Sequence, residues 1–415
     1  MRMLVIIDLY PPVSLGGAEL ACAALVHWMR RNHEVLVLTS DRDCHAVEGE
    51  AAVRRELPFL AWRRGDRIRA PLATARAAQV TRAALAELDP DLVYVVNTLE
   101  APQVGALLAR RAGFPVAYRL GELRSASALH QGDLYIDTLA TSARGVRRAW
   151  AGLVRIINRH PALRFDPRTP LQAAIAWSSE SLRRDAELPA GAVEPLLERV
   201  IYPATEHGAD FARMERRPAE HTTIAYVGHV TTTKGAEVAY RALAVLRDSY
   251  GIQARLVLAG HCTSAMRDRL GGLAGKLGVR EWVDLRGRLA PEHVGALMQS
   301  AHALVVPSVA HESFSLVCLE GALARVPIVA ARIGGIPELL AAGEHALLFE
   351  PGDPEACAGA LAETLQNPAT TAARVSRAFE RARELSLERY LHASEEFIAD
   401  AVAAFREHQA SGAAL

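Results

Sequence analysis

Two glutamates give this sequence its clearest chemical signal. Glu312 and Glu320 stand eight positions apart, shortly after the apolar stretch Ala303–Val306. If a helix separates them, its rise of about 1.5 Å per residue places them ~12 Å apart, roughly the length of a diphosphate between a sugar and a ribose. Each carboxylate could then accept hydrogen bonds from one set of hydroxyls. Both acids could instead merely cap and solvate a helix, but their apolar neighbours predict burial, where unpaired carboxylates are costly.

The residues that follow Glu312 predict a place for phosphate between the two acids. We expect a helix over Phe314–Ala324. Its first turn would leave backbone amides without a partner, and the positive end of the helix favours an anion there. The residues expected to contact the diphosphate in this way are Ser313, Phe314, Ser315 and Leu316.

A cationic loop follows another predicted strand. The segment Gly228–Gly235 comes directly after the strand that ends at Val227, and it contains His229 and Lys234. Lys234 is placed to neutralise a departing phosphate as a compact point charge. A lysine near the start of a helix opposes the helix dipole, which favours a bound anion over an ordinary surface lysine. His229 is either a second phosphate contact or a hydrogen-bonded loop residue.

Two glycine turns complete the candidate site. Gly16 and Gly17 follow the first predicted strand and allow a ligand to approach the backbone closely. A second turn, Gly334–Glu338, enters a helix. Its last residue, like Glu19 after the first turn, has an ordinary structural explanation as well, because acids favour the first turn of any helix.

The composition excludes several classes of protein. The chain has 415 residues, and its 47 basic residues balance its 47 acidic ones, so no overall positive charge attracts nucleic acid. The five cysteines are widely spaced without a CxxC pair, which argues against a disulfide framework or a zinc site. We find no clear metal cluster and expect no metal. The apolar start is too short for a signal peptide, and no stretch reaches the ~18 apolar residues of a spanning helix, so we expect a cytoplasmic protein.

The elements that must position these residues alternate between short apolar strands and longer helices. In the first half, strands are predicted at Leu4–Ile7, Glu34–Thr39, Leu92–Val96 and Pro115–Tyr118, and helices at Ala18–Arg31, Ala73–Leu88 and Ala101–Arg111. In the second half, strands are predicted at Thr223–Val227, Arg255–Ala259, Trp282–Leu285, Ala303–Val306 and Pro327–Ala330, and helices at Ala236–Tyr250, Pro291–Ser300 and Phe314–Ala324. Two such series predict two Rossmann-like α/β domains with parallel sheets, facing each other across a cleft.

The same alternation predicts where the domains begin and end. We expect an N-terminal domain over residues 1–210, elaborated around 123–172 where the alternation is poor, and a C-terminal domain over 218–385. The polar stretch Glu206–His221 contains the predicted boundary. Residues 386–415 read as helical and are expected to return to the N-terminal domain.

The order of four motifs resembles the family 4 glycosyltransferases of the GT-B fold. These motifs are Gly16–Glu19, Gly228–Gly235, the pair Glu312 and Glu320, and Gly334–Glu338. The resemblance is dense from Tyr226 to about Phe349, and in the N-terminal half it is carried mainly by Val5–Glu19. It implies a retaining, metal-independent enzyme that moves a hexose from a nucleotide diphosphate sugar, with UDP favoured, to a hydroxyl acceptor. The acceptor would be a glycan, a lipid-linked sugar or a small molecule, and no cofactor is implied beyond the donor.

The resemblance also implies a role for each matching residue. In the C-terminal domain, Glu312 would bind hydroxyls of the transferred sugar and Glu320 would bind the ribose. Lys234 would bind the diphosphate, together with the amides of Phe314 and Ser315. Arg288 and Leu289 would lie beside the base. Gly16 and Gly17 would lie against the donor phosphates from the N-terminal domain, which would bind the acceptor.

Three positions depart from the family's pattern. His229 stands where family members usually have arginine, and Ser315 stands where they usually have glycine. Many members have His-Asp near residue 118, whereas this chain has Gly121 and Glu122, so Glu122 becomes the candidate catalytic residue there. These departures predict an unusual donor or acceptor, or a reduced activity.

Other functions stay open at this level. The same fold hosts nucleotide-sugar epimerases and phosphorylases, and a non-catalytic sugar-nucleotide-binding protein would retain much of the site. The order of the lysine loop and the two glutamates favours the transferase over the first two. The departures at His229 and Gly121 keep the third open.

Residues 139–159 raise a separate question of location. Apolar residues recur there at helical spacing between several arginines, which predicts a basic amphipathic helix. Such a helix more often packs against its own domain, and we favour that interpretation. The alternative is peripheral contact with the anionic inner surface of a membrane.

Overall fold

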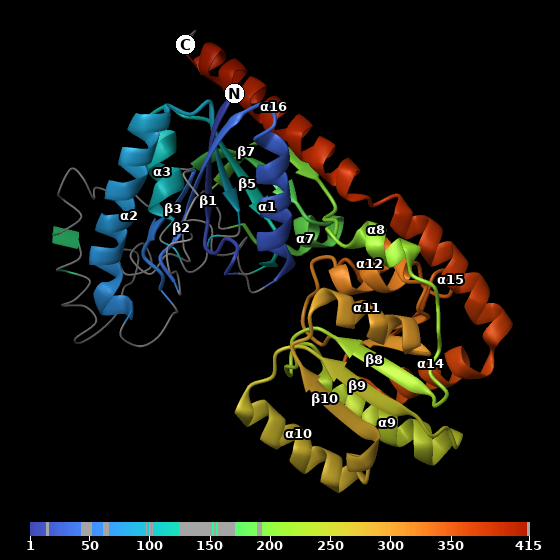
Figure 1. Cartoon of the computed structure of the whole chain (residues 1–415). Coiled ribbons are helices and arrows are strands. Elements are labelled where there is room, and N and C mark those ends of the chain that lie inside the picture. The colour runs from blue at the N-terminus through green and yellow to red at the C-terminus, as the bar shows by residue number, and fades with distance from the viewer. Residues whose placement is uncertain are drawn as a thin grey trace. The chain divides into compact units, whose positions relative to one another are not determined.

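The computed structural model divides the chain into two compact units (Figure 1). The described residues are 1–13, 16–42, 52–60, 66–96, 98, 101, 103–123, 152, 155–156, 171–188 and 193–412. The first unit comprises Met1–Tyr202 and Tyr390–Leu415, and the second comprises Pro203–Arg389. Each unit contains a parallel sheet with helices, as the sequence predicted.

The first unit is built on a parallel sheet whose inner strands are mostly apolar and buried. Within the described residues its strands lie in the order β3 (Val53–Leu57), β2 (Glu34–Ser40), β1 (Arg2–Ile7), β4 (Leu92–Val96), β5 (Val116–Leu120), β6 (Leu171–Trp177) and β7 (Val193–Val200). The register pairs Val5 of β1 with Val37 on one side and with Tyr94 on the other. Inner strands of this kind need helices on both faces, which explains the absence of polar alternation in β1 and β4.

Helices from both ends of the chain cover this sheet. They are α1 (Gly17–Met29), α2 (Asp66–Leu88), α3 (Val104–Arg111), α7 (Glu180–Asp185) and the part of α16 (Leu387–Gly412) that follows Arg389. The Trp28 indole of α1 donates to the Glu395 carboxylate of α16 over 2.8 Å. Arg199 of β7 pairs with Asp400 over 2.7 Å, and Phe397 is fully buried. The end of the chain is thus part of the first unit's core.

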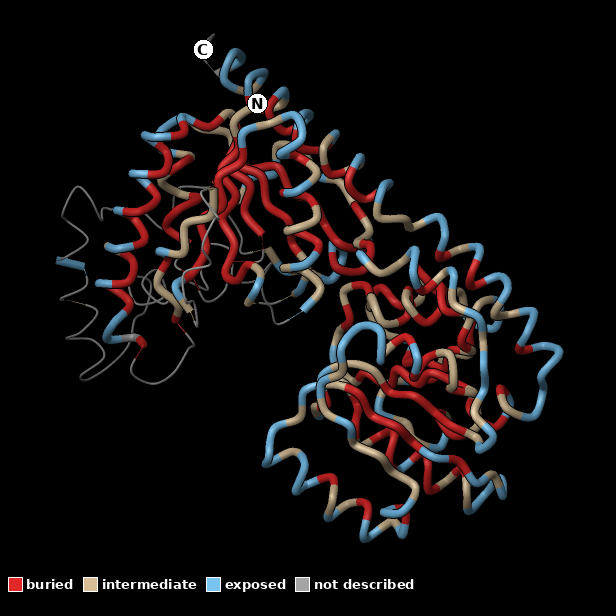
Figure 2. The backbone as a smooth tube through the Cα atoms, viewed as in Figure 1, coloured by how far each residue is buried: buried red, intermediate tan, exposed pale blue. Residues whose placement is uncertain are grey.

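The second unit has its own parallel sheet. The strand order within the described residues is β10 (Val283–Gly287), β9 (Arg255–Ala259), β8 (Thr223–Val227), β11 (Ala303–Val306), β12 (Ile328–Ala331) and β13 (Leu347–Phe349). Its helices are α8 (Gly208–Arg213), α9 (Ala236–Tyr250), α10 (Ser264–Leu277), η1 (Arg280–Trp282, a short 3-10 helix), α11 (Pro291–Ser300), α12 (Leu316–Leu323), α13 (Ile336–Leu339), α14 (Pro354–Gln366) and α15 (Pro368–Arg383). Helices α9, α10 and α14 share one apolar core with the sheet. The strands of both units form the buried centres in Figure 2.

Helix α12 lies tightly against the other side of this sheet. A Cβ added at Gly321 would come within 2.4 Å of the Leu304 side chain of β11. Most of the predicted phosphate-binding residues lie between β11 and α12. This close packing holds α12 directly beside β11.

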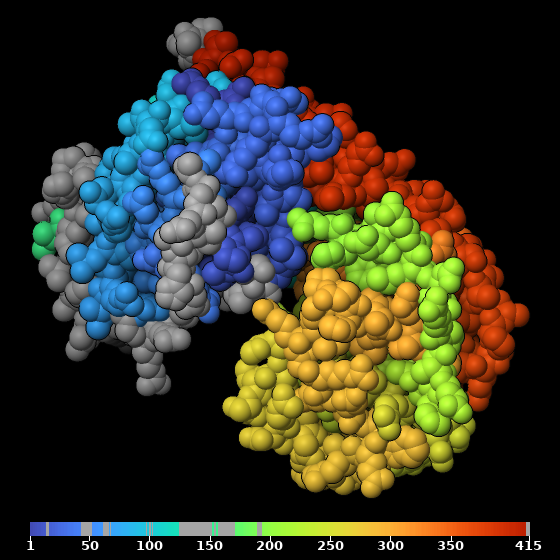
Figure 3. All heavy atoms as spheres, viewed as in Figure 1, coloured from blue at the N-terminus to red at the C-terminus, as the bar shows by residue number. Residues whose placement is uncertain are grey.

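The polar segment before β8 belongs to the second unit and does not separate the two units. Arg216 donates to the carbonyl oxygens of Met298 and Ala301 at the end of α11, each over 2.6 Å. Figure 3 shows this segment along the surface beside α11. The units divide at Tyr202 and again at Arg389, whereas the sequence placed the divisions at 210–218 and at 385. Backbone and side-chain bonds to α11 explain why the polar composition was misleading.

Several predicted elements begin at different residues in the structure, and two of them lie near the candidate site. Trp282 ends the short helix η1, and β10 runs over Val283–Gly287 instead of beginning at Trp282. Helix α12 begins at Leu316 and not at Phe314, because Ser315 has a backbone conformation outside the right-handed helical region. This later start changes which amides are available to a ligand.

The order of strands in the second sheet predicts where its ligand binds. Strand β8 has β9, the next strand along the chain, on one side and β11 on the other. The loops that leave β8 and β11 therefore turn to opposite faces of the sheet, and ligands of such sheets bind outside the carboxyl ends of strands at this switch point. The lysine loop follows β8, and the Glu312 loop follows β11.

No helix among the described residues combines enough length with enough apolar character to cross a membrane. Of the predicted helix at 139–159, only Gly152, Arg155 and Ile156 are described. Its packing and its contact with a membrane therefore stay predictions.

Candidate functional site

The loops after β8 and β11 are joined by backbone hydrogen bonds at the switch point. The amides of Val309 and Ala310 both donate to the Thr233 carbonyl oxygen, over 2.9 and 3.2 Å. The Tyr226 hydroxyl, at the end of β8, donates to the carbonyl oxygens of His229 and Lys234 over 2.8 and 3.2 Å. These bonds hold the backbone of the lysine loop beside the Glu312 loop.

Lys234 and Glu312 form an ion pair, as the position of their loops predicts. The Lys234 Nζ lies 2.6 Å from Glu312 Oε1. The Ser308 hydroxyl donates to the same carboxylate oxygen. Glu312 is only 8% exposed, whereas the side chain of Lys234 is 43% exposed. A buried carboxylate with two donors is held in one orientation, and the half-exposed ammonium beside it stays accessible to an anion.

The second glycine turn fixes the backbone of Glu312. Gly334 has a φ of +56°, and a Cβ there would lie 2.0 Å from the Glu312 carbonyl oxygen. The amide of Gly335 donates to that same oxygen over 2.8 Å. The close approach requires glycine at position 334, and it gives this turn a positioning role that its sequence did not reveal.

Gly334→Ala is expected to weaken the fold and to displace Glu312. A side chain at positive φ costs about 1–2 kcal/mol, and the clash with the Glu312 backbone adds to that cost. Gly343 is the matched control, because it has a φ of +74° with nothing within 4 Å of an added Cβ. In urea denaturation we expect a larger loss of unfolding free energy for Gly334→Ala than for Gly343→Ala. The rate of the sugar transfer that the sequence resemblance implies should fall at least about tenfold in Gly334→Ala only. Equal losses and intact transfer in both variants would contradict this.

The residues before α12 partly correct the predicted phosphate site. Ser315 is the N-cap, with a φ of +76° and a side-chain oxygen that accepts from the Cys318 amide over 3.4 Å. The first helical amides are therefore those of Leu316 and Val317, while Ser313 and Phe314 precede the cap. Positive φ favours glycine, so Ser315 holds a backbone conformation that a glycine would adopt with less strain.

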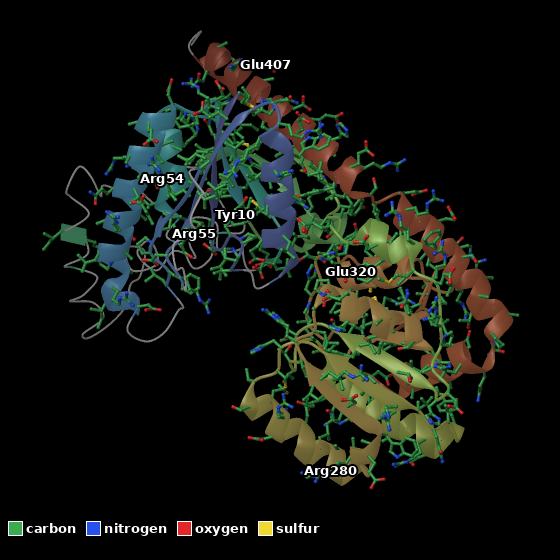
Figure 4. All side chains as sticks on the ribbon, in the orientation of Figure 1. Tyr10, Arg54, Arg55, Arg280, Glu320 and Glu407 are labelled. Carbon is green, nitrogen blue, oxygen red and sulfur yellow. The ribbon has the colours of Figure 1, made fainter. Side chains whose placement is uncertain are left out.

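Glu320 lies within α12 and has a hydrogen-bond partner of its own. The Thr205 hydroxyl donates to Glu320 Oε1 over 2.9 Å, and the His207 amide donates to the Thr205 hydroxyl over 3.3 Å. Figure 4 shows Glu320 on α12 in the second unit. Burial raises the pKa of the Glu320 carboxyl, while the Thr205 bond and the nearby His207 lower it in part. The structure records no contact between Glu320 and the Lys234–Glu312 pair.

A row of basic residues follows three neighbouring strands of the same sheet. His229 follows β8, His261 follows β9, and Arg288 follows β10. The rings of His229 and His261 have centroids 6.2 Å apart. Removal from water lowers the pKa of His229, and the positive charges of His261, Lys234 and Arg288 lower it further. We name these four residues the basic row; they are His229, His261, Arg288 and Lys234.

Three predicted residues belong to the first unit. Gly16 is the N-cap of α1, and its amide donates to the Glu19 carboxylate over 3.0 Å. Gly17 is the first residue of that helix. Glu122 is exposed, just after β5. Their roles toward a donor or an acceptor stay predictions.

The sequence contained signals for some residues that the predictions missed. At or just after the end of β8, β9 and β10 stands a glycine followed by a basic residue; these glycines are Gly228, Gly260 and Gly287. The chain also has only two lysines among its 47 basic residues, so a lysine at 234 is itself unusual. Thr205 had no such signal, because it stands far from Glu320 in the sequence.

Side chains that bind metals do not cluster in the described part of the chain. In that part of the chain no group of three or more His, Cys, Asp and Glu side chains could hold a metal ion. The recorded positive charge beside Glu312 is that of Lys234.

Comparison with known sequences places this site in a family. Residues 210–382 match the family described as Glycosyl transferases group 1. A D-inositol 3-phosphate glycosyltransferase of Acidothermus cellulolyticus is 28% identical over 287 residues, which cover 63% of this chain and 57% of the relative. One of Corynebacterium urealyticum is 34% identical over 170 residues, covering 40% of each chain. The chain thus spans about half the length of the curated relatives it matches.

Solved structures match the fold over nearly the whole chain. Anabaena Alr3699/HepE in complex with UDP-glucose has a TM-score of 0.68 at 19% identity, covering 96% of this chain and all of that one. Sucrose-phosphate synthase of Thermosynechococcus elongatus has a TM-score of 0.68 at 18% identity, covering 97% and 100%. These likenesses show the fold, and the matched family domain lies inside the second unit. The second unit therefore contains a domain that matches the group 1 glycosyltransferases, and the chain has the GT-B fold.

Proposed function

We propose that this protein is a retaining glycosyltransferase that moves a hexose from a nucleotide diphosphate sugar to a hydroxyl acceptor without a divalent metal. The observation that carries the proposal is the Lys234–Glu312 pair at the switch point of the second sheet. Its buried carboxylate suits sugar hydroxyls, and its ammonium suits a phosphate. The curated relatives are named glycosyltransferases, and HepE was solved with UDP-glucose, which supports a UDP-hexose as the donor.

The chemistry assigned to this site is the departure of a diphosphate from the anomeric carbon. The bond from the anomeric carbon to the phosphate oxygen breaks as the acceptor oxygen bonds to the same face of that carbon. The acceptor's proton passes to the leaving phosphate. Lys234 would stabilise the negative charge that develops on the leaving group, with the first amides of α12, and Arg288 and Leu289 would lie beside the base. Glu320 would accept hydrogen bonds from the ribose.

The acceptor is proposed from the names of the relatives. They are D-inositol 3-phosphate glycosyltransferases, so a phosphorylated polyol is the first acceptor to test here. We assign acceptor binding to the first unit, with Glu122 as its candidate catalytic residue and Gly16 and Gly17 as contacts of the donor phosphates. Localisation in the cytoplasm is part of the same proposal, because nucleotide sugars are the substrates.

One assay separates this function from its alternatives. UDP-, GDP- and dTDP-hexoses are first screened by thermal shift, since a ligand at 100 times its Kd stabilises a protein by about 2.7 kcal/mol. The binding donor is then incubated with inositol phosphates and followed by NMR, with and without EDTA. We expect a product that keeps the donor's anomeric configuration, at a rate that EDTA leaves unchanged.

The other outcomes each identify a different function. Inversion of the anomeric configuration would refute the retaining mechanism, and loss of activity with EDTA would refute metal independence. Interconversion of the donor without any acceptor would show an epimerase. Tight binding without turnover across glycan, lipid-linked and small-molecule acceptors would show a binding protein.

A further inference from the structure

The basic row is held together by the backbone at the carboxyl edge of the second sheet. The Gly228 amide donates to the Ala259 carbonyl oxygen over 2.9 Å, and the Gly260 amide donates to the Gly287 carbonyl oxygen over 2.7 Å. A Cβ at Gly260 would lie 1.8 Å from the Gly228 carbonyl oxygen. The residues that follow these glycines therefore leave adjacent strand ends at a fixed spacing. They are His229, His261 and Arg288.

The row carries more positive charge than its surroundings neutralise. Glu312 pairs with Lys234, while among the described residues His229, His261 and Arg288 form no ion pair with a carboxylate. Both histidines and Arg288 are exposed, so an anion from solvent can reach them. The groups that face His229 are His261, Lys234 and Arg288, all of them cationic or able to become so.

We propose that His229 is a proton-coupled ligand of the donor diphosphate: it is neutral in the free protein and becomes an imidazolium when the diphosphate binds along the row. This inference rests on the proposed function, because it requires a sugar nucleotide at the Lys234–Glu312 site. It gives His229 a role that an arginine at this position could not have, since a guanidinium keeps its proton at every relevant pH.

The electrostatics of the row supply the reason. In the free protein the cations of Lys234 and Arg288 oppose a proton on His229, as does its partial removal from water. A diphosphate brings two negative charges to the same place. An opposite charge within about 4–6 Å favours the charged form and shifts a pKa by about 1–3 units. The imidazole therefore takes one proton from solvent as the donor binds, and releases it when the diphosphate leaves.

Proton uptake makes donor affinity depend on pH in a defined direction. Binding raises the pKa of His229, so the bound state holds more protons than the free state between the two pKa values. Affinity is then greatest at acid pH and falls as pH rises through that range, by at most about tenfold per pH unit. Above the pKa of the bound state the dependence ends.

Titration calorimetry with UDP-glucose tests the proposal. Both phosphates of this donor are esterified, whereas the terminal phosphate of UDP would itself titrate near pH 6. Binding at pH 7 is measured in two buffers with different heats of ionisation, which gives the number of protons taken up. We expect wild-type protein to take up a measurable fraction of one proton. His229→Gln and His229→Arg should take up none, while His261→Gln, the neighbouring histidine, should retain the uptake.

The two His229 variants should also differ from each other in affinity. At pH 6 we expect His229→Gln to bind UDP-glucose about tenfold more weakly than wild type, and at pH 8.5 equally well. His229→Arg should bind with the same affinity at both pH values. Binding by wild type without proton uptake, or uptake that disappears in His261→Gln and persists in His229→Gln, would overturn the inference and leave the donor site intact. Failure of UDP-glucose, GDP-mannose and dTDP-glucose to bind at any pH would overturn both proposals.

Discussion

Lys234→Ala is expected to lower the kcat/KM of transfer by about 10²–10³-fold, the usual effect of removing one group that stabilises developing negative charge. The Lys234 ammonium is the closest recorded cation to Glu312, and its side chain is half-exposed at the switch point. Lys234→Arg keeps the charge but spreads it over a planar fork, so we expect an intermediate loss. The rate is measured as UDP released from the binding donor in the presence of its acceptor.

Lys234→Arg should keep a stability close to that of wild type. Lys234→Ala should lose some stability, because the Ser308 hydroxyl is then the recorded donor left to the buried Glu312 carboxylate. Lys276, near the end of α10, is the matched control because it is the chain's other lysine and is exposed. Lys276→Ala should transfer at the wild-type rate. A Lys234→Ala protein that retains a third of the wild-type rate, or an equal loss in Lys276→Ala, would remove Lys234 from the mechanism.

The sequence predicted that Lys234 would face the Glu312 loop across a bound diphosphate, and the ion pair between the two side chains follows from a simple rule of parallel sheets. Loops after parallel strands leave the sheet at the same edge, so two such loops with complementary charges meet if their strands are neighbours. The apolar runs that became β8 and β11 were visible in the sequence, and these strands are adjacent in the structure. The alternation of apolar strands with helices likewise explains why two α/β units with parallel sheets were predicted correctly.

The contact of Thr205 with Glu320 could not be predicted in this way. Thr205 belongs to an irregular segment with no periodic pattern, and 115 positions separate it from Glu320. The polar residues that follow Thr205 favour a linker by composition, whereas Arg216 binds them to α11 through carbonyl oxygens that any sequence would offer. Every residue has a backbone carbonyl oxygen, so the sequence does not show which residues accept such hydrogen bonds.

Edge strands and glycine-rich helices were missed for a related reason. Strand β7 is partly exposed at the edge of its sheet and contains Pro195, so its sequence does not read as a buried strand. Helix α10 contains three glycines, which weaken its helical signal, although Thr263 caps its first turn through the Met266 amide. In both cases tertiary packing overrides a weak local preference.

Glu320→Gln is expected to stabilise the free protein while weakening nucleotide binding. Burial raises the pKa of Glu320 above its ordinary value of 4.5. The folded state therefore holds a proton on Glu320 at pH values where the unfolded chain has released it, so the free energy of unfolding falls as pH rises above about 4.5. Glutamine removes this cost. The variant should unfold at a higher urea concentration than wild type at pH 7, and the difference should vanish below about pH 4.

The cost at neutral pH is explained if the Glu320 carboxylate binds the ribose diol. A hydrogen bond to a charged group contributes about 1.5–3 kcal/mol, which corresponds to about 10- to 150-fold in affinity. We therefore expect Glu320→Gln to bind UDP-glucose at least about tenfold more weakly than wild type. Wild type should also bind the 2′-deoxyribose analogue more weakly than UDP-glucose, and the variant should lose most of that discrimination, as a pairwise contact requires.

Glu220→Gln provides the control for both measurements, because Glu220 is an exposed glutamate in the segment before β8. It should change neither the urea midpoint nor the affinity. If Glu320→Gln gains stability and keeps full discrimination between ribose and deoxyribose, burial alone explains the raised pKa, and the ribose lies elsewhere. If it loses stability at pH 7, the Thr205 bond outweighs the cost of burial. The joint result of higher stability and lost discrimination is what distinguishes a carboxylate retained for binding from one retained for the fold.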